Sequence, residues 1–178
     1  MKNVFLLLVL FAVSFTAQSE NLEDIRDVLK HVESEHDPAA LGDYRGDTPT
    51  AFGILQIRKI AIDDVNRIYG TSYKVYDAFD IKCSEEIFKL YITHWTNKLE
   101  KREGRKATTA DIVRIWNGGP RGYLKGGTKW YLKKFLRYKK NKYLCKNGDK
   151  SEVHTKWTTG NNHQTVYTYR RCLYVQDS

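Results

Sequence analysis

The chain has 178 residues, with 30 lysines and arginines against 21 aspartates and glutamates, so its formal net charge at pH 7 is +9. This length suits one domain with a substantial core. The basic surface suits an anionic partner such as a cell-wall polymer, an acidic polysaccharide, an anionic lipid or a nucleic acid. The five histidines are scattered and do not combine with the three cysteines at metal-ligand spacing. The sequence therefore predicts no metal site and no cofactor.

The first 19 residues have the pattern of a secretory signal peptide. Lys2 gives a positive start, residues 4–13 form an apolar run, and residues 17–19 have the small-x-small pattern of a cleavage site. The apolar run is shorter than the roughly 20 residues that a membrane-spanning helix needs, although an uncleaved anchor is the alternative. We expect a secreted, extracellular chain that starts at Glu20 and carries a charge of +8, because Lys2 is removed and no acid with it. Export makes nucleic acid the least natural anionic partner.

Residues 20–140 are predicted to form a helical domain, because apolar residues recur there at helical spacing in five stretches. The first helix ends before Pro38, since proline disfavours the helical conformation of the residue before it. Residues 41–49 hold two glycines and two aspartates, which is typical of a loop or short hairpin. The other predicted helices cover 52–68, run from a cap at Ser84 to Leu99, run from a cap at Thr109 to Gly118, and run from Thr128 toward Tyr138.

The character of the sequence changes near residue 140. Residues 141–178 are rich in tyrosine, valine, threonine and tryptophan and contain two breaks of glycine and asparagine, which indicates two or three strands joined by turns. The predicted fold class is therefore mainly α, with a small C-terminal β appendix packed on the same domain. Cys145 and Cys172 both lie in the appendix and are the preferred disulfide pair, whereas a bridge from Cys83 to either of them is the alternative.

The carboxyl group of Glu33 is the first candidate for chemistry. Glu33 falls at the predicted end of the first helix, beside the apolar face marked by Val32, where burial and the negative end of the helix dipole both raise the pKa of a carboxyl. Cleavage of a glycosidic bond needs a carboxylic acid that keeps its proton beside the leaving oxygen. A glutamate at a helix end is more often a solvated surface group, so the surrounding motifs decide between the two interpretations.

Three motifs surround this glutamate in a fixed order. They are Glu33-Ser34 with Pro38 and Ala40 downstream, then Gly53-Ile54-Leu55-Gln56, and then Trp116-Asn117-Gly118-Gly119. With them the sequence resembles the lysozyme-like superfamily, specifically the soluble-lytic-transglycosylase-type domain, over roughly residues 24–135. The pair Gly42-Asp43 followed by the second motif also looks like goose-type lysozymes of the same superfamily.

The resemblance implies a helical fold with a cleft in which Glu33 is the catalytic acid. Trp116 stands where transglycosylases more usually have tyrosine. An indole can stack on a sugar face but lacks a phenol that could hydrogen-bond near the acid, and plain core packing is the alternative. Gly53 is expected to let the second helix approach the cleft floor, with ordinary helix packing as the alternative. The residues that the resemblance places against the substrate are Ser34, Gln56, Trp116, Asn117 and Gly118.

A second catalytic carboxylate is left open by the sequence. An inverting hydrolase needs a base to activate water, whereas in a lytic transglycosylase a hydroxyl group of the substrate attacks. Asp43 matches the Gly-Asp position of goose-type lysozymes, and Asp47 follows four residues later in the same loop. Aspartate is also common in turns for backbone reasons alone, so both stay candidates and not assignments.

Residues 121–146 hold ten lysines and arginines and no acidic residue, with aromatic residues between them. We expect the cations to face an anionic wall and the aromatic residues to be core. The sequence as a whole predicts a monomeric, secreted enzyme that cuts the β-1,4 bond between N-acetylmuramic acid and N-acetylglucosamine in bacterial peptidoglycan. The alternative is a catalytically silent carbohydrate-binding or cationic antimicrobial protein on the same fold.

Overall fold

The computed structural model describes residues 21–146, 151–160 and 163–172, and the side chains of residues 21–140. The predicted signal peptide and the side chains of Cys145 and Cys172 lie outside these ranges. The elements, with η for 3-10 helices, are α1 Leu22–Ser34, β1 Leu41–Gly42, β2 Ala51–Phe52, β3 Ile57–Arg58, α2 Lys59–Tyr69, η1 Val75–Phe79, α3 Ile81–Glu103, α4 Thr109–Gly118, η2 Gly122–Leu124, η3 Gly126–Thr128, α5 Lys129–Lys146, β4 Ser151–Gly160 and β5 His163–Cys172.

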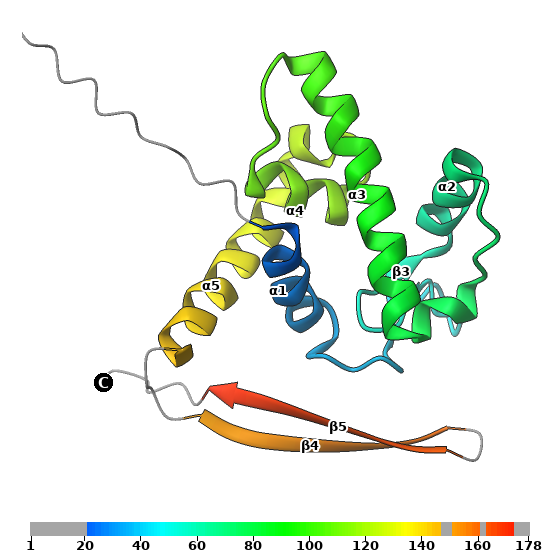
Figure 1. The fold of residues 1–178 in the computed structure, drawn as a ribbon, viewed down its shortest axis with the longest axis vertical. Helices are drawn as coiled ribbons and strands as arrows, with labels where there is room; N and C mark the ends of the chain where they lie inside the picture. Colours follow the sequence, from blue (N-terminus) through cyan, green and yellow to red (C-terminus); the bar gives the residue numbers. More distant parts are fainter. Residues whose placement is uncertain (1–20, 147–150, 161–162, 173–178) are drawn as a thin grey trace, which may run out of the picture.

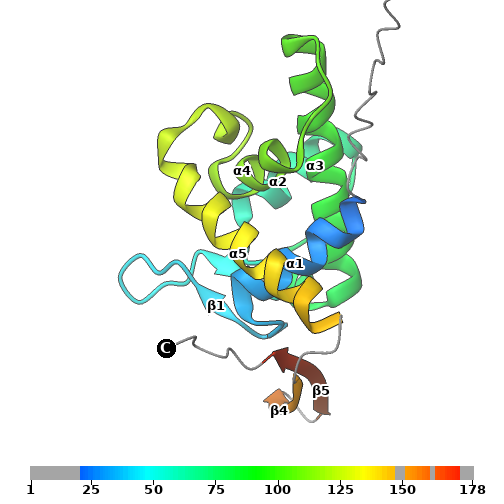
Figure 2. The same cartoon turned by 90° about the vertical axis from the view of Figure 1, so that its left-hand side faces the viewer.

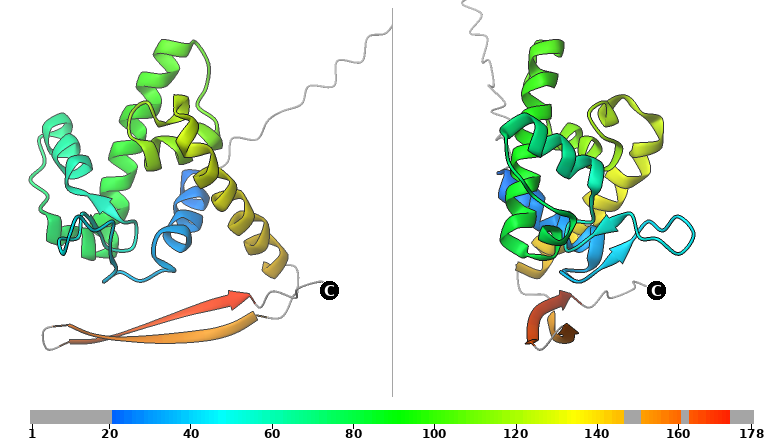
Figure 3. Two further views of the ribbon diagram at one scale, coloured as in Figure 1. Left: turned by 180° about the vertical axis from the view of Figure 1, so that it is seen from behind. Right: turned by 90° about the vertical axis from the view of Figure 1, so that its right-hand side faces the viewer.

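Helix α3 is the longest element and runs through the middle of the helical body (Figure 1). Helices α1, α4 and α5 lie on one side of it and contact one another, whereas α2 lies on the other side (Figure 3). None of the helices among the described residues combines the length and the apolar character that a membrane crossing requires. The centre of the core consists of Ile25, Leu29, Leu55, Ile57, Ile62, Val65, Ile87, Phe88, Ile92, Leu99, Ile115 and Phe135.

Helix α1 forms where the sequence predicts it. Asn21 caps its first turn by accepting a hydrogen bond from the backbone N–H of Glu23 at 3.2 Å, and Ile25 and Leu29 are buried on one face. The helix ends because Glu35 turns into the left-handed region at φ 53°, and its N–H bonds back to the carbonyl of His31. Glu33 therefore sits in the last helical turn, as predicted.

The second predicted helix is wrong over its first half. Residues 51–52 and 57–58 form strands β2 and β3, which join β1 in a three-stranded antiparallel sheet, and α2 begins only at Lys59. Gly53 at φ 72° and Gln56 at φ 49° make the turn between these strands, and a left-handed backbone cannot continue a right-handed helix. Apolar spacing alone did not separate a hairpin from a helix here. The small sheet next to the helices thus lies near the N-terminus and not in the C-terminal appendix.

The caps of α3 and α4 differ from the predicted ones. Asp80 caps α3 by accepting from the N–H of Cys83, while Ser84 lies inside the helix, buried, and donates to the carbonyl of Ala78 at 2.6 Å. Thr108, not Thr109, caps α4 and shares a capping box with Asp111.

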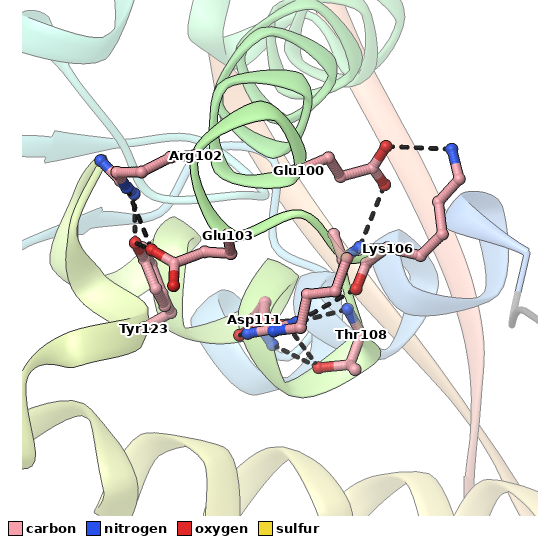
Figure 4. Close-up of polar contacts among 9 residues, drawn as sticks. Glu100, Arg102, Glu103, Lys106, Thr108, Asp111 and Tyr123 are labelled. Carbon is pink, nitrogen blue, oxygen red and sulfur yellow. Dashed lines mark hydrogen bonds and ion pairs between the residues drawn. The ribbon is translucent and has the colours of Figure 1, made fainter.

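The corner between α3 and α4 is closed by a dense set of polar contacts (Figure 4). The carboxylate of Glu100 accepts from the N–H of Ala107 at 3.0 Å, and Asp111 accepts from both terminal nitrogens of Arg105 at 2.6 and 3.1 Å. These contacts fix the direction in which the chain enters α4, and α4 carries Trp116 toward α1.

Strands β4 and β5 pair in antiparallel register from Ser151–Cys172 to Gly160–His163. This two-stranded ribbon follows α5 and lies below the helical body in Figure 1. It falls in the segment 141–178 that was predicted to be rich in strands, but α5 continues to Lys146, so the start of that segment, including Cys145, is helical and not strand.

Candidate functional site

The carboxyl of Glu33 lies where α1, α4 and α5 meet. The hydroxyl of Tyr131, on α5, donates to Glu33 Oε1 at 2.5 Å, and the indole N–H of Trp116, on α4, also hydrogen-bonds the carboxyl. Lys134, one turn after Tyr131, donates from Nζ to the carbonyl of Val32 at 2.7 Å. Two donors from two different helices thus hold one carboxyl at the end of a third.

Burial raises the pKa of Glu33 from 4.5 to about 7. Four groups act in the opposite direction because they favour the charged carboxylate: the hydrogen bonds from Tyr131 and Trp116 and the positive charges of Lys134 and Arg58. Desolvation is the largest effect, so the carboxyl keeps its proton to near-neutral pH. A carboxylic acid in this range can donate a proton at neutral pH and be reprotonated afterwards.

Tyr131 is a site residue that the sequence alone did not single out. The aromatic residues after 121 were predicted to be core, and Tyr131 is indeed only 3 % exposed. Tyr131 nevertheless places a phenol hydroxyl beside the carboxyl of Glu33, and Trp116 has no such group. A buried tyrosine usually finds a partner for its O–H, but the sequence does not say that this partner is 98 residues earlier in the chain.

Trp116 packs in the core, as one of its two predicted roles required, and also makes a contact that was not predicted; stacking on a sugar stays a prediction. Its ring meets Phe88 edge-on at 5.0 Å and Tyr91 at 5.9 Å between centroids, so one side of the indole is packed against α3. The indole N–H of Trp116 hydrogen-bonds Glu33. The packing of the ring on α3 therefore holds this donor in place.

Ser34 and Gln56 position the backbone around the acid. The hydroxyl of Ser34 donates to the carbonyl of Ile54 at 2.8 Å and so ties the end of α1 to the β2–β3 turn. The side-chain amide of Gln56 donates to the carbonyls of Ala40 and Gly53 at 3.2 and 3.0 Å. Gln56 is thus in the turn and not on a helix as predicted, and its contact with a sugar stays a prediction.

Gly53 has a definite steric role in this turn. A Cβ on Gly53 would lie 1.7 Å from the carbonyl oxygen of Ala78, so the turn can pack on η1 only as glycine. Gly53 was predicted to let the second helix approach the cleft floor; it lies instead in the β2–β3 turn, and the close approach is between this turn and η1.

The motif Asn117-Gly118 ends α4 and sets the path toward α5. A Cβ on Gly118 would lie 2.6 Å from Thr128 Cγ2, and the carbonyl of Gly118 accepts from Lys125 Nζ at 2.5 Å. Arg114, one turn earlier on α4, donates to the hydroxyl of Thr128 and to the carbonyl of Lys125, both at 2.9 Å. Close packing at Gly118 therefore fixes the start of α5; contact of Asn117 with substrate stays a prediction.

The two candidate second carboxylates lie in a different setting. The connection from β1 to β2 projects from the body (Figure 2), and both Asp43 and Asp47 are exposed on it. Asp43 Oδ2 forms an ion pair with Arg58 Nη2 at 2.5 Å. The charge of Arg58 also lowers the pKa of Glu33, with the smallest effect of the four groups that do so. Among the ion pairs of residues 21–140, none involves Asp47.

In residues 121–140 of the basic stretch, most cations are exposed and the aromatic residues are buried or half-buried, with one exception. Lys129, Lys133, Arg137 and Lys140 share the exposed face of α5, and Tyr131 and Phe135 are buried on the opposite face. Trp130 is the exception, at 61 % exposed. Within the described residues no cluster of three histidine, cysteine, aspartate or glutamate side chains could hold a metal ion.

The described fold is similar to that of lysozymes. The chain aligns with the inhibitor-bound lysozyme of Meretrix lusoria at a TM-score of 0.52 and 22 % identity, over 65 % of this chain and 88 % of that one. The complex of Aeromonas hydrophila PliI with Meretrix lusoria lysozyme gives a TM-score of 0.51 with the same identity and coverage. No protein-family profile and no curated protein sequence matches the chain. At this identity the likeness shows a lysozyme-like fold and does not favour the goose-type or transglycosylase branch that the motifs resemble.

Proposed function

We propose that this protein is a glycan-cleaving enzyme that cuts the β-1,4 bond between N-acetylmuramic acid and N-acetylglucosamine in bacterial peptidoglycan, with Glu33 as general acid. The observation that carries the proposal is the environment of Glu33. Its carboxyl is half-buried, has a pKa raised to about 7 by desolvation, and is held by donors from α4 and α5. The similar protein from Meretrix lusoria is a lysozyme, and the shared fold supports the choice of a muramidase reaction.

The proposed step is proton transfer to the leaving oxygen. As the glycosidic C–O bond breaks, its oxygen gains negative charge, and the protonated Glu33 carboxyl delivers a proton to it. Tyr131 and Trp116 keep the carboxyl in one orientation and, as donors, stabilise the carboxylate that remains after transfer. The exposed cations of α5 support attraction to an anionic wall, and the pattern of the first 19 residues supports export.

Product analysis tests the proposal. Purified peptidoglycan is incubated with the wild-type protein or with Glu33→Gln, and the released fragments are identified by mass spectrometry. We expect soluble disaccharide fragments from the wild type only. Reducing ends will identify hydrolysis, and 1,6-anhydro ends will identify transglycosylation. The rival function, a silent carbohydrate-binding protein, predicts equal binding to peptidoglycan by both proteins and fragments from neither.

A further inference from the structure

Trp130 is a large aromatic side chain that the fold leaves on the surface. It is the second residue of α5 and is 61 % exposed, whereas the next residue, Tyr131, is 3 % exposed. The two rings meet edge-on, with centroids 5.8 Å apart and planes at 89°. Because Tyr131 holds the carboxyl of Glu33, the exposed indole is one ring contact away from the group that holds the acid.

The backbone that carries Trp130 is held in place from two sides. Thr128 is buried and donates to the carbonyl of Gly122 at 2.8 Å, and Arg114 on α4 binds the hydroxyl of Thr128 and the carbonyl of Lys125. The indole therefore projects from the rigid first turn of α5 and not from a loose loop. A fixed aromatic surface loses little conformational freedom when a ligand covers it.

The charges beside Trp130 are positive. Lys129 precedes it, and Lys133 lies one helical turn later on the same exposed side. Among the ion pairs of residues 21–140, none involves either lysine. The surface thus offers a flat apolar ring flanked by cations without acidic partners on the described part of the chain.

These features fit a sugar chain with acidic substituents better than a membrane. Tyr131 and Phe135 of α5 are buried in the core, and among the described side chains of this helix only Trp130 and Leu136 are exposed large apolar groups, which is less than a helix needs to insert into lipid. A sugar ring has an apolar C–H face that matches one indole, and carboxylates on a stem peptide match the neighbouring lysines.

We propose that Trp130 is a glycan-binding platform, which stacks on a sugar ring of the strand next to the bond that Glu33 cleaves, with Lys129 and Lys133 attracting stem-peptide carboxylates. This inference rests on the proposed function, because it takes the glycan strand as the ligand. According to this inference, the first turn of α5 contributes to substrate binding but takes no part in the proton transfer by Glu33.

Binding without turnover tests the platform. In a Glu33→Gln background, Trp130→Ala, Trp130→Phe and Tyr76→Ala are titrated with an uncharged chitin-type oligomer and with a glycan fragment that carries stem peptides, by calorimetry. Tyr76 is the matched control, since it is 69 % exposed and lies in η1, which leads from α2 into α3. We expect Trp130→Ala to weaken both ligands about tenfold, Trp130→Phe to weaken them less, and Tyr76→Ala to change neither.

A charge variant separates the two parts of the platform. Lys129→Gln with Lys133→Gln should weaken binding of the fragment with stem peptides and leave the uncharged oligomer unaffected. Unchanged affinity for both ligands in Trp130→Ala, with the fold intact by circular dichroism, would overturn the proposal. So would a Trp130→Ala defect that appears only with anionic lipid vesicles. If the wild type releases no fragments but Trp130→Ala still weakens oligomer binding, the enzyme activity fails and the platform stands.

Discussion

The two sides of the site are built in opposite ways. On the side of α1, α4 and α5, the carboxyl of Glu33 is half-buried and accepts a hydrogen bond from Tyr131, and desolvation raises its pKa to about 7. On the side of the β1–β2 connection, Asp43 and Asp47 are exposed, and Asp43 is paired with Arg58. Both sides carry carboxylates, but only the carboxyl of Glu33 is desolvated enough to raise its pKa.

This difference shows which side chains of the site are held in position without a ligand. Helices fix Tyr131 and Trp116 by packing them in the core, so the donors around Glu33 keep their positions. The exposed loop can hold Asp43 only through a surface ion pair, and such pairs contribute little free energy in water. The fold therefore fixes the surroundings of the Glu33 carboxyl, whereas the position of Asp43 depends on an exposed loop.

The largest expected effect is the loss of activity in Glu33→Gln. An amide has the same size but cannot deliver a proton, so release of soluble fragments from peptidoglycan should fall by roughly 10²–10⁴-fold. Glu35→Gln is the matched control, because Glu35 is exposed two residues later and should keep full activity. Near wild-type release by a folded Glu33→Gln protein would remove Glu33 from the chemistry.

The packing of the β2–β3 turn predicts a large stability effect. Gly53→Ala places a Cβ 1.7 Å from the carbonyl oxygen of Ala78 at a φ of 72°, so the free energy of unfolding should fall by roughly 3 kcal/mol or more. Gly46→Ala has a similar φ of 59° with no atom within 4 Å, and should cost about 1 kcal/mol. Urea denaturation measures both; equal losses would mean that the contact with η1 is not tight.

The raised pKa of Glu33 predicts that this residue destabilises the protein at alkaline pH. Its pKa is about 7 in the folded state and 4.5 in the reference state, so the folded state binds the proton more tightly. Stability therefore falls as pH rises from 4.5 through 7 and stays lower above it. Glu33→Gln should unfold at similar urea concentrations near pH 4 and be more stable by about 3 kcal/mol near pH 9. A difference that does not depend on pH would contradict the raised pKa.

Tyr131→Phe should change the pH profile of the enzyme. The hydroxyl of Tyr131 lowers the pKa of Glu33, so its removal should raise that pKa further and shift the alkaline limb of the rate profile to higher pH. The maximal rate should also fall, because the carboxyl loses one of its fixed partners. Tyr138→Phe is the control on the same helix, since Tyr138 packs edge-on against His31 at 4.6 Å. An unshifted profile in Tyr131→Phe would show that the phenol only fills space.

The smallest effects are expected on the loop side. Asp43→Asn should reduce fragment release by no more than about tenfold through the loss of an exposed ion pair, and Asp47→Asn should leave it unchanged. A loss in Asp43→Asn as large as that in Glu33→Gln, with reducing ends among the wild-type products, would instead identify Asp43 as the base that activates water.

Sequence reasoning placed Glu33 correctly in the last turn of α1 because the signals there are local. The end of α1, the Glu33-Ser34 pair and the glycine next to Asn117 are short motifs with their own backbone requirements. It predicted a helix over residues 52–58, where the structure has strand ends and a turn. The step from Phe52 to Leu55 fits helical spacing and the step from Leu55 to Ile57 fits extended spacing, so the pattern is mixed, and the positive φ values in the turn exclude a helix.

Two features of the site could not be read from the sequence. The partnership of Tyr131 with Glu33 joins residues that meet only after α5 packs on α1, and helical spacing shows burial without showing which group a hydroxyl will reach. The exposure of Trp130 also runs against the expectation for a large aromatic residue beside a buried one. Both residues belong to the first turn of α5, where packing and function coincide.

The pKa of Glu33 is the quantity that tests the proposed role of this residue most directly. Side-chain carboxyl resonances can be followed by carbon NMR across the pH range in the wild-type protein, with Glu33→Gln identifying the resonance of Glu33 by its absence. We expect a midpoint near 7, well above the ordinary value of 4.5 for a glutamate. A midpoint at or below 4.5 would mean that Glu33 is an ordinary carboxylate at neutral pH and would contradict its role as the acid.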